Sequence, residues 1–429
     1  MTIVACSTPP GVSGIAVVRI SGKSAIKNIS AFVKDSPFDE KKPLSRVCFL
    51  VDGDGEVFDE AVITSYIGPN SYTGENLVEI SCHGNPKIVS RIIDLSVDAG
   101  SRLAEAGEFT KTAFLNGKLD LSEAESVASI IHSLSLTGVK AGVKNLKGGL
   151  SKEIHSIKSS LISLVASLEF NLDISEEDLQ PNLLKQSGET ILKVSKKLND
   201  CIRCFEETKM FQSGASVVIL GPPNAGKSTL FNRLVNKNQS IVTSVEGTTR
   251  DVIEKNINIS GLPILLKDTA GIRDSGDDVE KIGVERSFVE AKDADLVVVL
   301  NDRSLSFGDI KHIHVFNKSD IKTPDEKYDI SISAKTGDGI KKLKETVYNS
   351  LIGNKIQTDT LVISKRQCNA IKSALEHIKE ARLLLLAGDS IELLVEDINR
   401  SIGCLDSITE KTTKDDVLDA VFSSFCVGK

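Results

Sequence analysis

The segment that most constrains the fold of this chain is residues 221–228, GPPNAGKS, which match the pattern G-x4-G-K-[S/T]. A short apolar run, residues 215–220, precedes the motif, and a helical pattern begins near Ser228. Glycines let the backbone wrap around phosphate groups so that successive N–H groups point inward. Lys227 can then reach the β- and γ-phosphates, and Ser228 can bind Mg²⁺. The motif predicts a phosphate-binding loop between a strand and a helix.

Two further segments contain the residue types that such a loop needs around the metal and the last phosphate. Residues 268–271, DTAG, follow an apolar strand pattern. Asp268 can hold Mg²⁺ through water, and Gly271 can offer its N–H to the γ-phosphate. Thr248 and Thr249 can supply a switch-loop hydroxyl to the same ion. The three segments together predict a complete triphosphate and magnesium site.

The next motif indicates which base is bound. Residues 317–320, NKSD, also end a strand pattern. The Asp320 carboxylate suits the two N–H donors on the guanine edge, a pair that adenine lacks. Residues 333–335, SAK, would complete the base pocket. These elements occur in the order found in the GTPase superfamily, so we predict a GTP-binding domain rather than a P-loop ATPase.

The position directly after residues 268–271 bears on hydrolysis. Many GTPases have a glutamine there that orients the attacking water, but this chain has Ile272, whose side chain cannot hydrogen-bond. The polar stretch 273–280 offers Glu280 as a replacement, although the residues alone favour a solvated carboxylate at the start of a helix for this position. We therefore expect either another polar group in the role of the glutamine or a slow switch.

Length and periodicity predict several domains. A chain of 429 residues is too long for one compact core, and its 40% hydrophobic and 26% charged residues are ordinary for globular proteins. An α+β domain comes first, because a helical pattern at residues 86–99 follows strand patterns at residues 14–20, 46–51, 59–66 and 76–81.

From Leu121 onward the hydrophobic period becomes helical. Ser122 and Glu125 fit a capping box. One long helix is predicted by an apolar stripe with spacings of three and four residues: Ile154, Ile157, Leu161, Leu164 and Leu168. A second long helix is expected over residues 185–209, and helical patterns return after residue 353.

The resulting fold class is multidomain, with an α+β N-terminal domain, a discontinuous helical bundle and an inserted α/β P-loop domain. The predicted boundaries are 1–118, 119–210, 211–353 and 354–429, with the second and fourth segments forming the bundle. Residues 301–311 are too few for the helix that a GTPase domain normally places there, so a docking surface of this domain is expected to differ.

Charge, cysteines and hydropathy exclude several classes of protein. A net charge of −7 argues against coating a polyanion over a broad surface, but it leaves room for a local basic groove. Aromatics total 4% and Trp is absent, which argues against an extensive base-stacking platform. No apolar run reaches the roughly 18–20 residues of a membrane span, and no signal peptide is visible. We expect a cytoplasmic protein with eight free cysteines, in which Cys201 and Cys204 pack in a helix rather than bind zinc.

Segments outside the nucleotide motifs carry a more specific resemblance. They are residues 2–11 (TIVACSTPPG), 18–22 (VRISG), 68–75 (GPNSYTGE), 83–84 (HG), 107–110 (GEFT), 113–121 (AFLNGKLDL) and 425–429 (FCVGK). Together they closely resemble the bacterial tRNA-modification GTPases of the MnmE (TrmE) family, and the resemblance covers essentially the whole chain.

This resemblance implies a homodimer whose N-terminal domains bind a tetrahydrofolate one-carbon donor of the 5-formyl or 5,10-methylene type. It implies GTP hydrolysis that K⁺ stimulates and that accompanies transient pairing of two GTPase domains. It also implies an FAD-dependent partner, MnmG (GidA), in a heterotetramer or larger assembly. Together they would add an aminomethyl or carboxymethylaminomethyl group to C5 of the wobble uridine of certain tRNAs.

The resemblance implies roles for individual residues of the nucleotide site. The implied Mg²⁺ ligands are Ser228 and Thr249, and the implied K⁺ ligands are Asn224, Thr243, Val245 and Thr248. A cation there would supply the positive charge of an arginine finger, and Glu280 would act through a bridging water. The predicted GTP contacts are Asn224, Ala225, Gly226, Lys227, Ser228, Thr229, Thr243, Ser244, Val245, Glu246, Gly247, Thr248, Thr249, Asp268, Thr269, Ala270, Gly271, Asn317, Lys318, Asp320, Ser333, Ala334 and Lys335.

The implied folate contacts are Arg19, Glu79, Lys118 and Lys429. Glu79 could accept hydrogen bonds from pterin N–H groups, and the three cations could attract the anionic glutamate tail. The resemblance places the Cys426 thiol beside the reactive carbon of the folate, as a nucleophile, as an acid or base, or only as a packing group.

One alternative function stays open. It is a non-catalytic GTP switch in ribosome assembly, in which the nucleotide state only gates RNA binding. The folate-type residues and the Cys426 tail favour the enzyme, because an assembly switch has no use for them.

Overall fold

The chain folds into two compact units, each discontinuous in sequence. One comprises Met1–Ala128, Asn145–Leu198 and Asn369–Lys429, and the other comprises Ser129–Lys144 and Asn199–Cys368. The computed structural model describes residues 1–172, 181–236, 253–268, 291–308, 310–323, 327–353, 361, 363–388, 390–409, 415–423 and 425–429. The four finer domain boundaries stay a prediction, because these two units are coarser.

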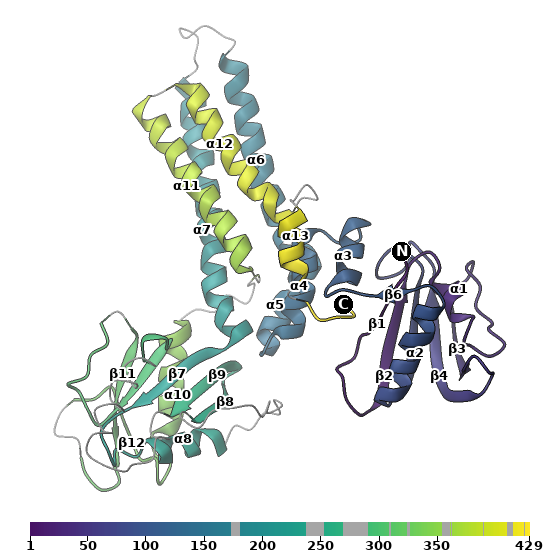
Figure 1. Ribbon diagram of the computed structural model, residues 1–429. Coiled ribbons are helices and arrows are strands. Elements are labelled where there is room, and N and C mark those ends of the chain that lie inside the picture. The colour runs from purple at the N-terminus through teal and green to yellow at the C-terminus, as the bar shows by residue number, and fades with distance from the viewer. Residues whose placement is uncertain are drawn as a thin grey trace. The chain divides into compact units, whose positions relative to one another are not determined.

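The N-terminal residues form a six-stranded sheet in the order β3-β4-β5-β2-β1-β6 (Figure 1). Its strands are β1 (Ile3–Cys6), β2 (Ser13–Ser21), β3 (Leu44–Val51), β4 (Val57–Tyr66), β5 (Leu77–Gly84) and β6 (Arg102–Leu103). Only β1 and β6 pair in parallel. Helices α1 (Ala25–Ile29) and α2 (Pro86–Asp98) bury apolar side chains such as Ile26 and Ile92 against one face. The expected α+β arrangement is present.

The next helices are α3 (Glu108–Leu115), α4 (Leu121–His132), α5 (Leu136–Leu146), α6 (Gly149–Leu172) and α7 (Pro181–Ser213). After the second sheet come α11 (Lys365–Ala387), α12 (Ile391–Thr409) and α13 (Asp415–Phe422). The predicted stripe of α6 is confirmed, because all five of its side chains are buried. Contacts join α6 to α12 through Lys158 and Asp406, and α11 to α12 through His377 and Asp397. The long helices run alongside one another in Figure 1.

The predicted capping box at the start of α4 is wrong by two residues. Asp120 Oδ1 accepts a hydrogen bond from Glu123 N at 2.8 Å, and Asp120 N donates to Glu123 Oε2 at 2.9 Å. The sequence DLSE contains the same cap pattern as SEAE two positions later. Helix α4 begins at the earlier of the two patterns, because this start places Leu121 and Ala124 in a buried cluster.

A second six-stranded sheet has the order β12-β11-β10-β7-β9-β8. Its strands are β7 (Ala215–Leu220), β8 (Ile253–Ile259), β9 (Leu262–Asp268), β10 (Leu296–Leu300), β11 (His312–Asn317) and β12 (Ile330–Ile332). The strand patterns predicted at residues 215–220, before residues 268–271 and before residues 317–320 are confirmed as β7, β9 and β11, which pair in parallel with their neighbours β10 and β12 and with one another. Strand β8 adds an antiparallel edge that was not predicted.

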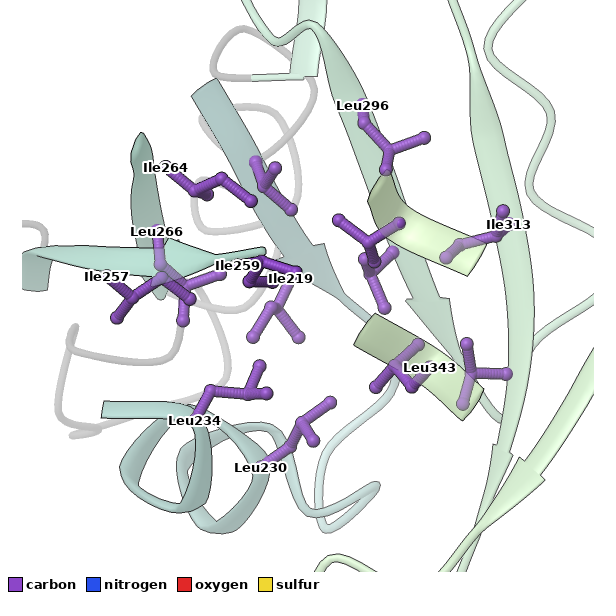
Figure 2. Close-up of a cluster of buried hydrophobic side chains, with 14 of the residues drawn as sticks. Ile219, Leu230, Leu234, Ile257, Ile259, Ile264, Leu266, Leu296, Ile313 and Leu343 are labelled. Carbon is purple, nitrogen blue, oxygen red and sulfur yellow. The ribbon is translucent and has the colours of Figure 1, made fainter. Parts of the chain in front are cut away.

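Helices α8 (Lys227–Asn236) and α10 (Ile340–Ile352) pack against one face of this sheet. Figure 2 shows the core between them, where Leu230, Leu234 and Leu343 meet the branched side chains of the strands. Residues 301–308 and 310–311, between β10 and β11, contain no helix, as the short connection predicts. No helix in the described ranges is long and apolar enough to cross a membrane.

Candidate functional site

The phosphate-binding loop lies between the buried strand β7 and the start of α8, as the motif predicts. The first-turn N–H groups of a helix have no partners inside the helix, so they suit an anion. Gly226 has φ of +91°, and an added Cβ there would lie 2.3 Å from Asn317 Nδ2. Only glycine therefore fits between the loop and the asparagine.

Lys227 is held inside this loop. Its Nζ donates to Gly221 O at 2.8 Å and to Pro222 O at 3.1 Å. Burial lowers the pKa of Lys227, and the Asp268 carboxylate opposes that shift. Asp268 ends β9, next to β7, and is only 1% exposed. The structure thus brings together the lysine and the aspartate that the sequence assigns to the phosphates and to the metal.

Asn317 connects the phosphate loop to the predicted base pocket. Its Nδ2 donates to Ala225 O at 2.8 Å, and its Oδ1 accepts from Ala334 N at 2.9 Å. Its own N–H donates to Asn301 Oδ1 at 2.7 Å. Arg233 from α8 donates its Nε to Ala334 O at 3.0 Å, which fixes the same loop from the other side. Sequence reasoning missed Asn301 and Arg233, because neither lies in a motif.

The switch and hydrolysis residues lie outside the described residues. They are Thr243, Ser244, Val245, Glu246, Gly247, Thr248, Thr249, Thr269, Ala270, Gly271, Ile272 and Glu280. Their roles stay predictions.

Three of the four predicted folate residues, Arg19, Glu79 and Lys429, form a compact polar cluster in the first unit. Arg19 on β2 is the cross-strand neighbour of Glu79 on β5. Its Nε and Nη2 donate to Glu79 Oε1 at 2.9 and 2.6 Å, and its Nη1 donates to Gly428 O at 3.4 Å. The C-terminal tail therefore reaches the centre of the N-terminal sheet.

Lys429 and Cys426 belong to this cluster. Burial lowers the pKa of Lys429 and Arg19 lowers it further, whereas Glu79 and Cys426 oppose the shift. Ser7 Oγ donates to Gly428 O at 3.0 Å, and Val427 bridges to Ala106. The Cys426 thiol is exposed.

Lys118 lies somewhat apart from the cluster. Its Nζ donates to Pro69 O at 3.0 Å, and among the described residues no hydrogen bond or ion pair joins it to Arg19 or Glu79. The structure thus brings three of the four predicted residues together and places the fourth against the neighbouring loop.

Two aromatic rings beside Arg19 were missed as site residues. The guanidinium carbon lies 5.5 Å from the centroid of Tyr72 and 5.9 Å from that of Phe109. Tyr72 Oη is 2.8 Å from Thr110 Oγ1. Tyr72 lies in segment 68–75 and Phe109 lies in segment 107–110. Their position in these two segments was the sequence signal that could have identified them as site residues.

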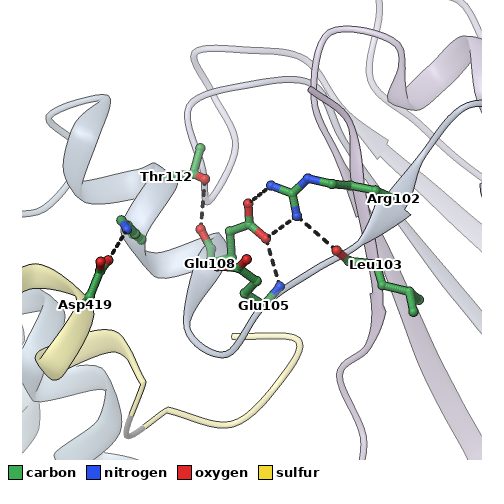
Figure 3. A network of polar contacts seen from close by, with 7 residues as sticks. Arg102, Leu103, Glu105, Glu108, Thr112 and Asp419 are labelled. Atoms are coloured by element: carbon green, nitrogen blue, oxygen red, sulfur yellow. Dashed lines mark hydrogen bonds and ion pairs between the residues drawn. The ribbon is translucent and has the colours of Figure 1, made fainter. Parts of the chain in front are cut away.

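A polar network holds α3 in place near this cluster (Figure 3). Arg102 pairs with Glu108 and donates to Leu103 O at 2.9 Å. Burial raises the pKa of Glu108, but its hydrogen bonds with Arg102 and with Glu105 N outweigh burial and lower it. On the next turn, Lys111 contacts Asp419 of α13 at 2.6 Å. The helix that carries Phe109 is therefore tied both to the sheet and to the C-terminal helix.

Asn317 contacts both the predicted phosphate loop and residues 333–335, so it ties the predicted phosphate-binding and base-binding segments together. A phosphate loop between a strand and a helix is the feature of a P-loop nucleotide-binding domain. Cys201 is buried and Cys204 is half-buried, both on α7. The described ranges contain no group of three or more potential metal-ligating His, Cys, Asp or Glu residues.

Comparison with known proteins then identifies the family. A family model described as "MnmE helical domain" matches residues 121–426, and one described as "GTP-binding protein TrmE N-terminus" matches residues 2–118. Proteins called "tRNA modification GTPase MnmE" are similar over the full chain. The one from Aquifex aeolicus is 39% identical, covering 100% of this chain and 99% of its own. The one from Thermotoga petrophila is 36% identical, covering 100% of both. The chain belongs to the MnmE (TrmE) family.

Among solved structures, the G domain of the FeoB iron transporter of T. maritima is 24% identical, with a TM-score of 0.24. The match covers 32% of this chain and 98% of that chain.

Proposed function

We propose that this chain is a K⁺-stimulated GTP hydrolase that acts in tRNA wobble-uridine modification. The observation that carries the proposal is the Asn317 junction between phosphate loop and base pocket, in a chain that belongs to a family of tRNA modification GTPases over its whole length. GTP would bind with its phosphates in the loop around Lys227 and with its guanine on Asp320. The protein would act in the cytoplasm, with the α/β domain inserted in the helical domain at the boundaries predicted above.

The residues of the loop fit the metals that the family implies. Ser228 offers a hydroxyl at the start of α8, directly after Lys227, which interacts with the buried Asp268. Hydroxyl and carboxylate oxygens are the donors that Mg²⁺ prefers, and Thr249 would complete the set. Asn224, at φ of +60°, offers an amide oxygen for K⁺ beside Thr243, Val245 and Thr248. The bound cations would stabilise negative charge on the phosphates. Glu280 would orient the attacking water through a bridging water.

We propose that the cluster around Arg19 binds the tetrahydrofolate donor. Glu79 can accept hydrogen bonds from a pterin, and Arg19, Lys118 and Lys429 can attract the glutamate tail. The exposed Cys426 thiol lies on the same tail as Lys429. The chain would act as a homodimer with the FAD-dependent partner MnmG (GidA), on tRNA and without a membrane.

Mass analysis of wobble nucleosides tests the function. In a strain that lacks this gene, the wild-type chain should restore the modified uridine, whereas Cys426→Ser, Lys227→Ala and Glu280→Ala should not. Cys404→Ser, at a half-buried thiol of α12, is the matched control and should restore it. Normal nucleosides together with defective ribosomal subunits would support the assembly switch instead.

Exchange of K⁺ for Na⁺ tests the cation. GTP turnover by the full-length chain should fall in Na⁺, because the larger K⁺ is the ion that the loop ligands are expected to fit. Equal rates in both salts would rule out the Asn224 site.

A further inference from the structure

Residues 426–429 form a turn that has Cys426 at its first position. Lys429 N donates a hydrogen bond to Cys426 O at 3.3 Å, which closes a four-residue β-turn. Gly428, the third residue of this turn, has φ of +93°. A positive φ at the third position is what a type II turn requires, and glycine adopts it without strain. The turn therefore fixes the direction of the backbone that follows Cys426.

Gly428 also lies tightly against the end of β1. A Cβ added to it would lie 2.6 Å from Cys6 O and 2.8 Å from Ser7 Cα. Both of these are main-chain atoms that the sheet holds in place. Cys6 is the β1 residue opposite Val18, and Ser7 N donates to the carbonyl of the preceding β2 residue, Val17, at 2.8 Å. Only glycine lets the turn approach the sheet so closely.

Two side chains of the first unit hold the carbonyl group of Gly428. Ser7 Oγ donates to Gly428 O at 3.0 Å, and Arg19 Nη1 donates to the same oxygen at 3.4 Å. Arg19 is also paired with Glu79. Ser7 makes the shorter of the two contacts with the turn, although it is not among the predicted folate residues.

The chain is anchored on both sides of Cys426. The Phe425 side chain is buried, and its ring centroid lies 5.4 Å from that of Phe422. Val427 forms an antiparallel bridge with Ala106, and Figure 3 shows this yellow segment beside the connection that leads into α3. The Cys426 thiol itself is exposed. It is thus presented to solvent from a backbone that is held at both ends.

The thiol lies within electrostatic reach of the Arg19 cluster. Burial lowers the pKa of Lys429 and Arg19 lowers it further, whereas Glu79 and Cys426 raise it. The carboxylate of the cluster and the thiol therefore act on the same ammonium group. The position of the turn decides how close Cys426 lies to the predicted folate residues.

We propose that Ser7 and Gly428 are positioning residues, which hold the Cys426 thiol at the Arg19 cluster during tRNA modification. Ser7 acts through the Gly428 carbonyl, and Gly428 acts through the turn and its close fit to β1. The proposal rests on the proposed function, because it takes the Cys426 thiol as a group that the modification needs. Holding a reacting group in the right place speeds the reaction without adding a contact to the substrate.

Hydrogen exchange followed by mass spectrometry measures how firmly the turn is held in the full-length chain. Exchange in a peptide that contains residues 425–429 reports local opening of this segment. Ser7→Ala removes one hydrogen bond, so the segment should exchange about two- to tenfold faster. Ser7→Thr keeps the hydroxyl and should restore wild-type exchange. Gly428→Ala should speed exchange further, because the added Cβ forces the turn away from β1.

Two further measurements separate positioning from folate binding. The modified wobble uridine that each variant restores in the strain lacking this gene should fall with Ser7→Ala and fall further with Gly428→Ala. The dissociation constant for 5-formyltetrahydrofolate, measured by equilibrium dialysis, should stay at the wild-type value in Ser7→Ala. GTP turnover should also stay unchanged in both variants, because the nucleotide site belongs to the other compact unit.

The matched controls are Gly100→Ala and Ser45→Ala. Gly100 has φ of +100°, but an added Cβ there would have nothing within 4 Å, so its alanine variant carries the backbone penalty without a collision. Ser45 Oγ lies 2.9 Å from Thr64 Oγ1 on β3, the edge strand at the other end of the sheet from β6. Both controls should keep wild-type exchange at residues 425–429 and wild-type modification. Thermal unfolding of each variant identifies a global folding defect, and the Ser7 pair carries the test if Gly428→Ala does not fold.

The proposal is overturned if Ser7→Ala and Gly428→Ala leave exchange at residues 425–429 unchanged, or if exchange becomes faster while modification stays at the wild-type level. It is also overturned if Ser7→Ala weakens folate binding as much as it lowers modification, because Ser7 would then serve the folate directly. A failure of the proposed function is distinguishable, because unmodified wobble uridine would then persist even with the wild-type chain, whatever the exchange rates of the variants.

Discussion

Replacement of Gly226 by alanine tests whether Asn317 joins the two halves of the GTP site. The new Cβ would lie 2.3 Å from Asn317 Nδ2, so the asparagine must move. Movement breaks its hydrogen bonds with Ala225 O and Ala334 N. Each such bond contributes about 0.5–1.5 kcal/mol, so the expected loss at the site is about 1–3 kcal/mol.

The backbone cost of the substitution can be measured separately. Gly226 has φ of +91° and Gly261 has φ of +87°, but an added Cβ at Gly261 would have nothing within 4 Å. Gly261→Ala therefore carries the left-handed backbone penalty of about 1–2 kcal/mol without a collision. The difference between the two alanine variants isolates the displacement of Asn317.

Titration of a fluorescent GTP analogue into the full-length variants measures this difference. Gly226→Ala should bind GTP about 5- to 150-fold more weakly than Gly261→Ala, because about 1.4 kcal/mol corresponds to tenfold in affinity. In thermal unfolding Gly226→Ala should be the less stable variant, because it loses the hydrogen bonds of Asn317 in addition to the backbone penalty that both share. Equal GTP affinity of the two variants would refute the role assigned to Asn317.

Three further predictions concern stability. In urea titrations, Leu161→Ala should lower the free energy of unfolding by about 2–5 kcal/mol, because Leu161 is fully buried. The control Ile162→Ala changes a neighbour that is 52% exposed, so it should lower the free energy of unfolding by less than about 0.5 kcal/mol. Asp120→Ala should cost about 0.5–2 kcal/mol by removing the cap of α4; an unchanged urea midpoint would contradict this. Burial and Arg19 lower the pKa of Lys429, so between that pKa and 10.5 the unfolded chain binds more protons and stability rises with pH. Lys429→Gln should reduce this rise in thermal unfolding and leave the part that comes from Lys227, whose pKa burial also lowers. A rise equal to that of the wild type would exclude Lys429 as a source.

Local chemistry made the helices, strands and phosphate loop predictable from sequence. The apolar residues of α6 repeat every three or four positions, and the helical period alone determines that residues at this spacing lie on one face of the helix. The loop at residues 221–228 needs only glycines and a lysine at short spacing, so its structure follows from its own residues. The start of α4 was less predictable, because two overlapping cap patterns compete and only packing of Leu121 and Ala124 selects one.

Contacts between distant segments could not be predicted in this way. Arg19 meets the carbonyl of Gly428 across 409 sequence positions, and Asn301 supports Asn317 although it lies in no motif. Such contacts depend on which strands become neighbours and which faces the connections leave uncovered, and these are properties of the whole chain topology. The amino-acid sequence by itself thus determined the GTP-binding class and the family resemblance. The tertiary structure alone decided that the carbonyl of Gly428 meets Arg19 and that Asn301 supports Asn317, because groups from separate segments become neighbours only after the chain has folded.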